Sequence, residues 1–183
     1  MRVIAGSKRG MKLFSPAGES VRPTMDQVKE AAFNIMQFDL PDGIFLDMFA
    51  GSGQMGIEAL SRGAEAAYFF EPDRAAFALL NKNLSRTGLT AGAKAFCAPY
   101  SRLAALSPRP RFDLVYMDPP FAAGEYEKAL CFLADGFLHD GSTVICEAER
   151  GVELPEAVAG FTDEVRRYGH VCMHIYRKRE ETE

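Results

Sequence analysis

The stretch Leu46-Asp47-Met48-Phe49-Ala50-Gly51-Ser52-Gly53-Gln54-Met55-Gly56 decides the fold of this chain. It joins an apolar segment, Ile44–Met48, to a segment with helical spacing, Gln54–Arg62, and its glycines match the pattern G-x-G-x-x-G. Glycines at a strand-to-helix turn let the backbone approach a ligand where a Cβ atom would collide. The stretch therefore predicts a Rossmann-like α/β unit with a ligand site at the carboxyl end of its first strand.

Two acidic residues near the glycines indicate which ligand is bound. Glu71 follows Gly51 by 20 residues and comes directly after the next apolar segment, where a carboxylate can accept hydrogen bonds from ribose hydroxyls. Asp47 lies four residues before Gly51, at a position that is usually apolar in dinucleotide-binding loops. It favours a ligand with an amino-acid half, and so S-adenosylmethionine over NAD. We expect the cofactor to be bound by Asp47, Phe49, Gly51, Ser52, Gly53, Glu71 and Pro72.

A second motif, Asp118-Pro119-Pro120-Phe121, follows the apolar segment Phe112–Met117. In a parallel sheet this places it beside the same crevice. Two consecutive prolines lack N–H donors and keep the backbone extended, so the Asp118 carboxylate and the Pro119 carbonyl are fixed acceptors. Two acceptors that hold an exocyclic base amine turn its lone pair towards a methyl sulfonium, and Phe121 offers a face on which an extruded base can stack. The motif predicts methyl transfer to an amino nitrogen, with catalytic Asp118, Pro119 and Phe121.

Strand-like and helix-like segments alternate along most of the chain, which predicts a parallel sheet covered on both faces. Two final strand-like segments, Glu164–Tyr168 and Val171–Arg177, are separated by only two residues. Two residues cannot hold a crossover, so these segments form a hairpin whose second strand is antiparallel to the sheet. The expected fold is an α/β, Rossmann-like class I methyltransferase over residues 25–183, with a seven-stranded, mostly parallel sheet and helices on both faces. The other expected strands are Ile44–Met48, Ala66–Phe70, Lys94–Cys97, Phe112–Met117 and Ser142–Glu147, and the expected helices are Thr24–Phe38, Gln54–Arg62, Asp73–Arg86, Tyr100–Leu106 and Glu125–Leu133.

Residues 1–24 are expected to form a basic arm before this domain. Short strand-like stretches flank Gly6-Ser7-Lys8-Arg9-Gly10, which predicts a small β-hairpin. The whole chain has a net charge of −4, but no acidic residue interrupts the basic ones at its start. Local basic surface can hold phosphates even on an acidic protein, although lysines also protect exposed sheet edges. The basic residues of this stretch are Arg2, Lys8, Arg9 and Lys12.

The composition excludes several classes of protein. The chain has 183 residues, of which 48% are apolar, which suits one globular domain with a small extension. Its four cysteines are widely spaced and form no C-x-x-C pair, so we expect no metal site. No apolar run approaches the ~20 residues of a membrane span, and the first apolar stretch is too short for a secretory signal. We therefore expect a cytoplasmic protein that does not bind membranes.

Nearly the whole chain resembles the RsmD-type 16S ribosomal RNA (guanine-N2) methyltransferases. The resemblance implies that a monomer transfers a methyl group from S-adenosylmethionine to the 2-amino group of a guanine in 16S rRNA. It also implies that the substrate lies within an assembled or assembling small ribosomal subunit. The matching segments include Arg2–Gly6, Arg9–Leu13, Arg22–Ala31, Leu46–Gly53, Gly56–Ala64 and Asp118–Phe121. Together with the basic arm, the resemblance implies that the substrate is contacted by Arg2, Lys8, Arg9, Arg22, Thr24 and Pro120.

One position departs from the pattern of the family. Relatives usually carry Asp or Asn after the third strand, where the side chain can accept a hydrogen bond from the adenine amino group. Here the stretch is Phe96-Cys97-Ala98-Pro99-Tyr100. We expect Ala98 and Pro99 to lie beside the adenine, which would then be bound by backbone groups or by stacking.

Three other functions stay open at the level of the sequence. The first is an amino-methyltransferase that acts on DNA adenine or on a protein glutamine amide, because the Asp118 motif suits any such nitrogen. The second is an NAD-binding oxidoreductase, which Asp47 disfavours. The third is a catalytically silent rRNA-binding assembly factor. Guanine rather than adenine rests on the family resemblance alone.

Overall fold

The computed structural model describes residues 1–16, 23–120 and 124–178, with the side chains of residues 23–25 and 178 excluded. Two of the predicted site residues, Arg22 and Phe121, lie outside the described residues. The strands are β1 (Ile44–Asp47), β2 (Ala66–Phe70), β3 (Ala93–Phe96), β4 (Phe112–Met117), β5 (Leu138–Glu149), β6 (Ala157–Val158), β7 (Phe161–Tyr168) and β8 (Val171–Lys178). The helices are α1 (Pro23–Met36), α2 (Gln54–Ser61), α3 (Arg74–Thr87) and α4 (Glu125–Ala134), with 3₁₀-helices η1 (Gly6–Lys8), η2 (Thr90–Gly92) and η3 (Tyr100–Ala105).

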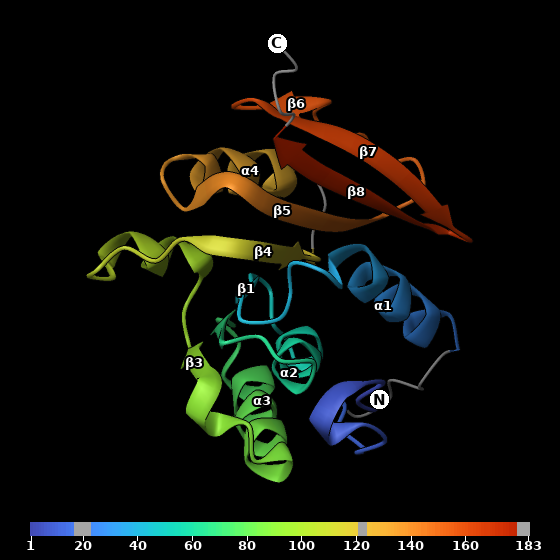
Figure 1. Cartoon of the computed structure of the whole chain (residues 1–183), viewed down its shortest axis with the longest axis vertical. Coiled ribbons are helices and arrows are strands. Elements are labelled where there is room, and N and C mark those ends of the chain that lie inside the picture. Colours follow the sequence, from blue (N-terminus) through green and yellow to red (C-terminus); the bar gives the residue numbers. More distant parts are fainter. Residues whose placement is uncertain (17–22, 121–123, 179–183) are drawn as a thin grey trace.

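The strands form one sheet in the order β3-β2-β1-β4-β5-β8-β7-β6. Strands β3, β2, β1, β4 and β5 are parallel, and β8 runs antiparallel between β5 and β7. Figure 1 shows this sheet with α1, α2 and α3 along one side of it and α4 beside β5. The Rossmann-like α/β fold with a C-terminal antiparallel hairpin is therefore confirmed. No helix in the described part of the chain is long and apolar enough to cross a membrane.

Three expectations about individual elements need correction. The sheet has eight strands rather than seven, because Ala157–Val158 folds back onto β7 through Ala159, whose φ is 49°. A strand of two residues is too short to show alternation. The segment predicted as a helix at Tyr100–Leu106 is a 3₁₀-helix. Helix α1 begins at Pro23, one residue before Thr24, because the fixed φ of proline suits the first turn of a helix.

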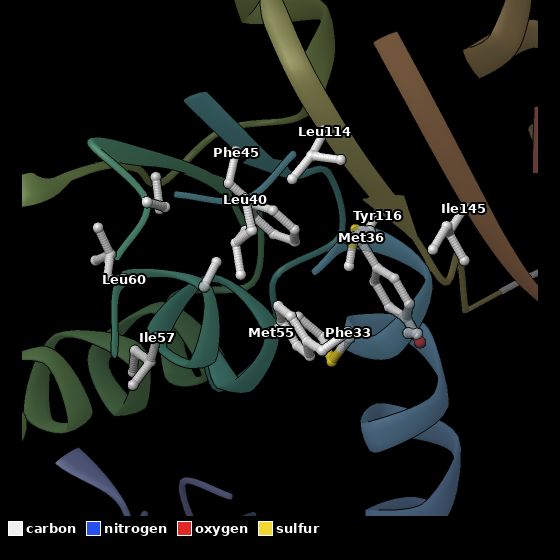
Figure 2. Packing of buried hydrophobic residues seen from close by; sticks show 14 of the residues in the cluster. Phe33, Met36, Leu40, Phe45, Met55, Ile57, Leu60, Leu114, Tyr116 and Ile145 are labelled. Atoms are coloured by element: carbon white, nitrogen blue, oxygen red, sulfur yellow. The ribbon is translucent and has the colours of Figure 1, made fainter. Parts of the chain in front are cut away.

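Two apolar clusters cover the two faces of the sheet. One contains side chains of α1, α2, α3 and the N-terminal arm, and the other contains side chains of η3 and α4. Neighbouring residues of one strand belong to different clusters, as Phe45 and Leu46 of β1 do. Figure 2 shows side chains of α1, α2 and the strands meeting in the first cluster. Strands covered on both faces have no polar face, which explains the continuous apolar runs in the sequence.

The start of the arm forms a reduced version of the expected hairpin. A single antiparallel bridge joins Arg2 to Lys12, with η1 between them. The N–H of Val3 donates to the carbonyl of Met11, and the N–H of Gly10 donates to the carbonyl of Val3, both at 2.9 Å. Val3 is fully buried. The arm thus contributes side chains to the main core.

Polar side chains of α2 and α3 fix the arm in place. Glu58 on α2 is fully buried and accepts hydrogen bonds from the N–H groups of Ile4 and Ala5, at 2.8 and 2.9 Å. Asn83 on α3 is also buried and pairs with both backbone polar groups of Phe14, at 2.7 and 3.0 Å. Buried side chains that satisfy backbone groups hold a segment in one position. These bonds anchor the arm at Ile4, Ala5 and Phe14.

Candidate active site

Three neighbouring strands bring acidic side chains to the same edge of the sheet. Met117 of β4 pairs with Cys146 of β5, so the next residues, Asp118 and Glu147, lie side by side. On the other side of β4, Asp47 of β1 pairs with Tyr116. The side chains meet at a cavity of about 80 Å³, lined by Lys29, Asp47, Gln54, Tyr116, Asp118 and Glu147 among others.

A larger cavity of about 610 Å³ continues from the acidic one. Phe49, Ala50, Gln54 and Asp118 line both cavities. A volume of this order suits a small-molecule cofactor. Most of the predicted cofactor and catalytic residues that the structure describes line this space: Phe49, Gly51, Ser52, Glu71, Pro72, Asp118, Pro119 and Pro120.

Asp47 lies beneath the glycine loop. Its side chain is 2% exposed, and its Oδ2 atom accepts a hydrogen bond of 2.9 Å from the N–H of Gly56 in the first turn of α2. Burial raises the pKa of Asp47 to about 7, against the opposing effect of the Gly56 hydrogen bond, and the nearby charge of Glu71 adds to the increase. A cation placed beside Asp47 would favour its charged form.

Glu71 connects the glycine loop to the start of α3. Its two carboxylate oxygens accept hydrogen bonds from the N–H groups of Gly51 and Asp73, at 2.8 and 2.7 Å. Gly53 has a left-handed φ of 81°, and a Cβ atom there would lie 2.9 Å from Cγ of Leu80. The loop therefore needs glycine at this position. The fixed Glu71 carboxylate keeps lone pairs that ribose hydroxyls can reach from the cavity.

Asp118 faces both cavities in an environment that disfavours its charge. Desolvation raises the pKa of Asp118 to about 7, with further contributions from the charges of Glu147 and Asp47. Burial also raises the pKa of Glu147, although the hydrogen bond from the Tyr116 hydroxyl to its Oε2 atom opposes this effect. Three carboxylates so close together suit a ligand that brings positive charge or N–H donors.

The sequence analysis missed several residues of the acidic cavity. Glu147 is the last residue of the predicted strand Ser142–Glu147, and this position is the signal that could have identified it, although β5 continues to Glu149. Lys29 gives no such signal, because it lies among polar and apolar residues of an ordinary helical pattern. Its side chain is 4% exposed, and its ammonium group donates to the carbonyl of Arg2 at 2.6 Å and lies 3.4 Å from Oε2 of Glu58. Burial lowers the pKa of Lys29, against the effect of Glu58.

Some predicted residues lie apart from the cavities. Gly53 shapes the loop without lining either cavity, and neither Ala98 nor Pro99 is among the lining residues. Instead, Glu125 of α4 lines the larger cavity and accepts a hydrogen bond of 2.9 Å from the Tyr100 hydroxyl. The expected adenine contacts at Ala98 and Pro99 stay a prediction.

Arg2, Lys8 and Arg9 of the arm, which were predicted to bind the substrate, do not line either cavity. Arg2 is exposed and pairs with Asp26 at 3.1 Å. Arg9 is exposed and Lys8 is half-buried, and the N–H of Lys8 donates to the Ser61 hydroxyl at 2.9 Å. The backbone of Thr24 belongs to α1. Both ends of the described arm reach the larger cavity, which is lined by Met1 and Pro16.

Comparisons with known proteins identify the family. The model of the family described as "Conserved hypothetical protein 95" matches residues 1–177. "Putative rRNA methyltransferase YlbH" of Bacillus subtilis is 40% identical over 98% of this chain and 100% of its own length. "Ribosomal RNA small subunit methyltransferase D" of Escherichia coli K12 is 36% identical over 100% of this chain and 92% of its own.

A solved structure agrees with these relatives. "Putative methyltransferase yhhF from Escherichia coli" matches with a TM-score of 0.84 and 32% sequence identity, and the match covers 97% of each chain. The match extends over the arm, the glycine loop and the antiparallel hairpin of this chain. The chain therefore belongs to the Conserved hypothetical protein 95 family, the RsmD-type family of ribosomal RNA methyltransferases that its motifs resemble.

Proposed function

We propose that this protein transfers a methyl group from S-adenosylmethionine to the exocyclic 2-amino group of a guanine in 16S rRNA. One observation carries the proposal. Asp118 lies where a cofactor-sized cavity lined by the glycine loop meets a small acidic cavity. A methyl donor in the first cavity and a base amine at Asp118 would thus meet at one point. The names of the relatives support ribosomal RNA as the substrate class.

The residues of the larger cavity fit S-adenosylmethionine. When bound, this cofactor supplies an electrophilic methyl group on a positively charged sulfur. Glu71 lines this cavity and would accept hydrogen bonds from the ribose hydroxyls. Asp47 lines the small acidic cavity beside it and would hold the ammonium group, directly or through the backbone of the glycine loop and α2. Gly51 lines the cavity with a φ of 52°, and a Cβ atom there would project into open space. Because residue 51 is glycine, no side chain occupies this part of the cavity, and the space stays free for the ligand.

Asp118 and Pro119 act on the base amine. The Asp118 carboxylate and the Pro119 carbonyl accept its two N–H groups and turn the nitrogen lone pair towards the methyl carbon. The Asp118 carboxylate would also accept the proton that the amine loses when it takes up the methyl group supplied by the bound cofactor. A pKa near 7 suits a group that holds this proton briefly. The main contributions are positioning and electrostatic stabilisation.

The basic arm provides the contact with RNA in this proposal. Both ends of its described part line the larger cavity, so RNA that reaches Asp118 passes close to the arm. The exposed Arg2 and Arg9 lie on the arm and can contact phosphates. We further propose that the enzyme acts as a cytoplasmic monomer on an assembled or assembling small ribosomal subunit, without a metal.

A labelled-methyl transfer assay tests this function. Purified protein and S-adenosylmethionine carrying a labelled methyl group are incubated with undermethylated small subunits, with naked rRNA and with DNA. We expect label in the small subunits. Transfer to DNA alone would support the DNA methyltransferase alternative, and no transfer to any substrate would support a silent assembly factor. Calorimetric binding of NAD in place of S-adenosylmethionine would support the oxidoreductase.

A further inference from the structure

We propose that Glu147 is a third acceptor of the active site and that it accepts the N1–H of guanine, so that this side chain determines which base is methylated. The inference rests on the proposed function, because it requires a base that presents its 2-amino group to Asp118. The Asp118 motif cannot choose the base by itself, since any exocyclic amine offers N–H groups to its acceptors. The specificity for one base must therefore come from another group that lies beside Asp118.

Glu147 is the side chain that the fold places there. The register of β4 with β5 puts it next to Asp118, and both carboxylates line the cavity of about 80 Å³. Their charges interact strongly enough that Glu147 raises the pKa of Asp118. A planar base edge that reaches Asp118 therefore also comes close to Glu147.

Two tyrosines hold Glu147 in position. The Tyr116 hydroxyl donates to Oε2 of Glu147, and the Tyr126 hydroxyl donates to its backbone carbonyl. Tyr116 and Tyr126 are both buried, at 4% exposure each. Within the described residues, Oε1 of Glu147 makes no hydrogen bond or ion pair. One oxygen of the carboxylate is thus fixed, and the other is left for a ligand in the cavity.

The Watson–Crick edge of guanine matches two adjacent carboxylates. Its N1–H donor lies next to the 2-amino group, so Asp118 can bind the amine while Glu147 accepts N1–H. Adenine and 2-aminopurine have a lone pair at N1, which a carboxylate at the same place would repel. The wrong base is then bound less well because it places a lone pair, and not an N–H donor, beside the Glu147 carboxylate.

The test compares guanine with 2-aminopurine, which keeps the 2-amino group but lacks N1–H. Small subunits are reconstituted with 16S rRNA that carries either base at the position mapped as methylated, and kcat/KM is measured for wild type and for Glu147→Gln. The Tyr116 hydroxyl keeps the amide oxygen of the variant, so its NH₂ group faces the cavity as a donor. We expect Glu147→Gln to lose about 10- to 100-fold on guanine, as for a lost hydrogen bond to a charged group. We expect no such loss on 2-aminopurine.

Two controls separate this role from others. Glu149→Gln removes an exposed carboxylate from the same strand and should leave both rates unchanged. Calorimetric binding of S-adenosylmethionine should be the same for Glu147→Gln and wild type, which shows that the variant is folded. An equal loss on both bases would show that Glu147 acts only through the charge of Asp118. Such a loss, or no loss on guanine, overturns the assignment. No transfer to guanine by wild type would instead overturn the proposed function itself.

Discussion

Asp47 ends β1 and Asp118 directly follows the adjacent strand β4, but the two side chains have different surroundings. Asp47 is buried beneath the glycine loop and bonds to α2, whereas Asp118 faces the point where the two cavities meet. Burial raises the pKa of both carboxyl groups to about 7. We therefore assign Asp47 to the cofactor and Asp118 to the base amine.

This division of roles predicts how single substitutions act. Asp118→Ala should lower kcat for methyl transfer by at least about 100-fold, because it removes a fixed acceptor from the reacting nitrogen. Its affinity for S-adenosylmethionine, measured by calorimetry, should stay close to that of wild type. Asp47→Ala should instead weaken cofactor binding. If Asp118→Ala lost as much cofactor affinity as Asp47→Ala, the two roles would be assigned wrongly.

Asp47 should also make the stability of the free protein depend on pH. Its pKa is raised on folding, so its contribution to the free energy of unfolding is fully present below the ordinary pKa of 3.8 and is lost as pH rises through about 7. Asp47→Asn removes the buried charge and can still accept from the N–H of Gly56. We expect the variant to be more stable than wild type at pH 8 by about 1–2 kcal/mol, with weaker cofactor binding.

Urea unfolding of both proteins without cofactor at pH 5 and pH 8 measures this effect. The advantage of Asp47→Asn should shrink at pH 5, where Asp47 of the folded wild type is mostly protonated. An advantage that is the same at both pH values would show that the charge of Asp47 is not its cause.

At the scale of elements, the arm depends on a close contact with α2. Gly6 has a φ of 80°, and a Cβ atom there would lie 1.8 Å from the backbone oxygen of Ser61. The hydroxyl of Ser61 also donates to the carbonyl of Ala5 at 2.7 Å. The arm can therefore approach α2 only if glycine occupies position 6.

A matched pair of glycine substitutions tests this contact. Gly10 has nearly the same φ, 83°, but a Cβ atom there would meet nothing within 4 Å. Gly10→Ala should thus lose about 1 kcal/mol of unfolding free energy from backbone strain alone. Gly6→Ala should lose about 3 kcal/mol or more, because the clash is added to the strain. Equal losses in urea unfolding would contradict the contact.

The elements that the sequence predicted well are those with a strong local pattern. β2 and β4 match their expected bounds because each consists almost entirely of apolar residues, with Asp113 of β4 as the exception, and is flanked by polar residues, proline or glycine. The two-residue β6 has no pattern to detect, and the sequence pattern of a six-residue segment such as η3 does not distinguish a 3₁₀-helix from a short α-helix. Contacts such as that of Glu58 with the arm join residues more than 50 positions apart, and no local signal encodes them.

At the scale of the whole molecule, the sheet order explains which parts of the site were predictable. The strand ends of β1, β2 and β4 carry recognisable motifs, which predicted Asp47, Glu71 and Asp118 as site residues. The structure places all three at the two cavities, and their roles stay a prediction. Glu147 has no motif around it, and it joins the site only because β5 lies beside β4. The basic charge of the arm predicts a contact with RNA, which stays a prediction, and the anchoring of the arm on α2 and α3 depends on tertiary packing that no local pattern shows.

Nucleoside analysis of the methylated product tests the central claim most directly. Undermethylated small subunits are incubated with the protein and labelled S-adenosylmethionine, and their 16S rRNA is digested to nucleosides and separated. The proposed function predicts that the label is found in N2-methylguanosine and that Asp118→Ala produces none. Label in methylated adenosine or in any other nucleoside, or label that persists with Asp118→Ala, would contradict it.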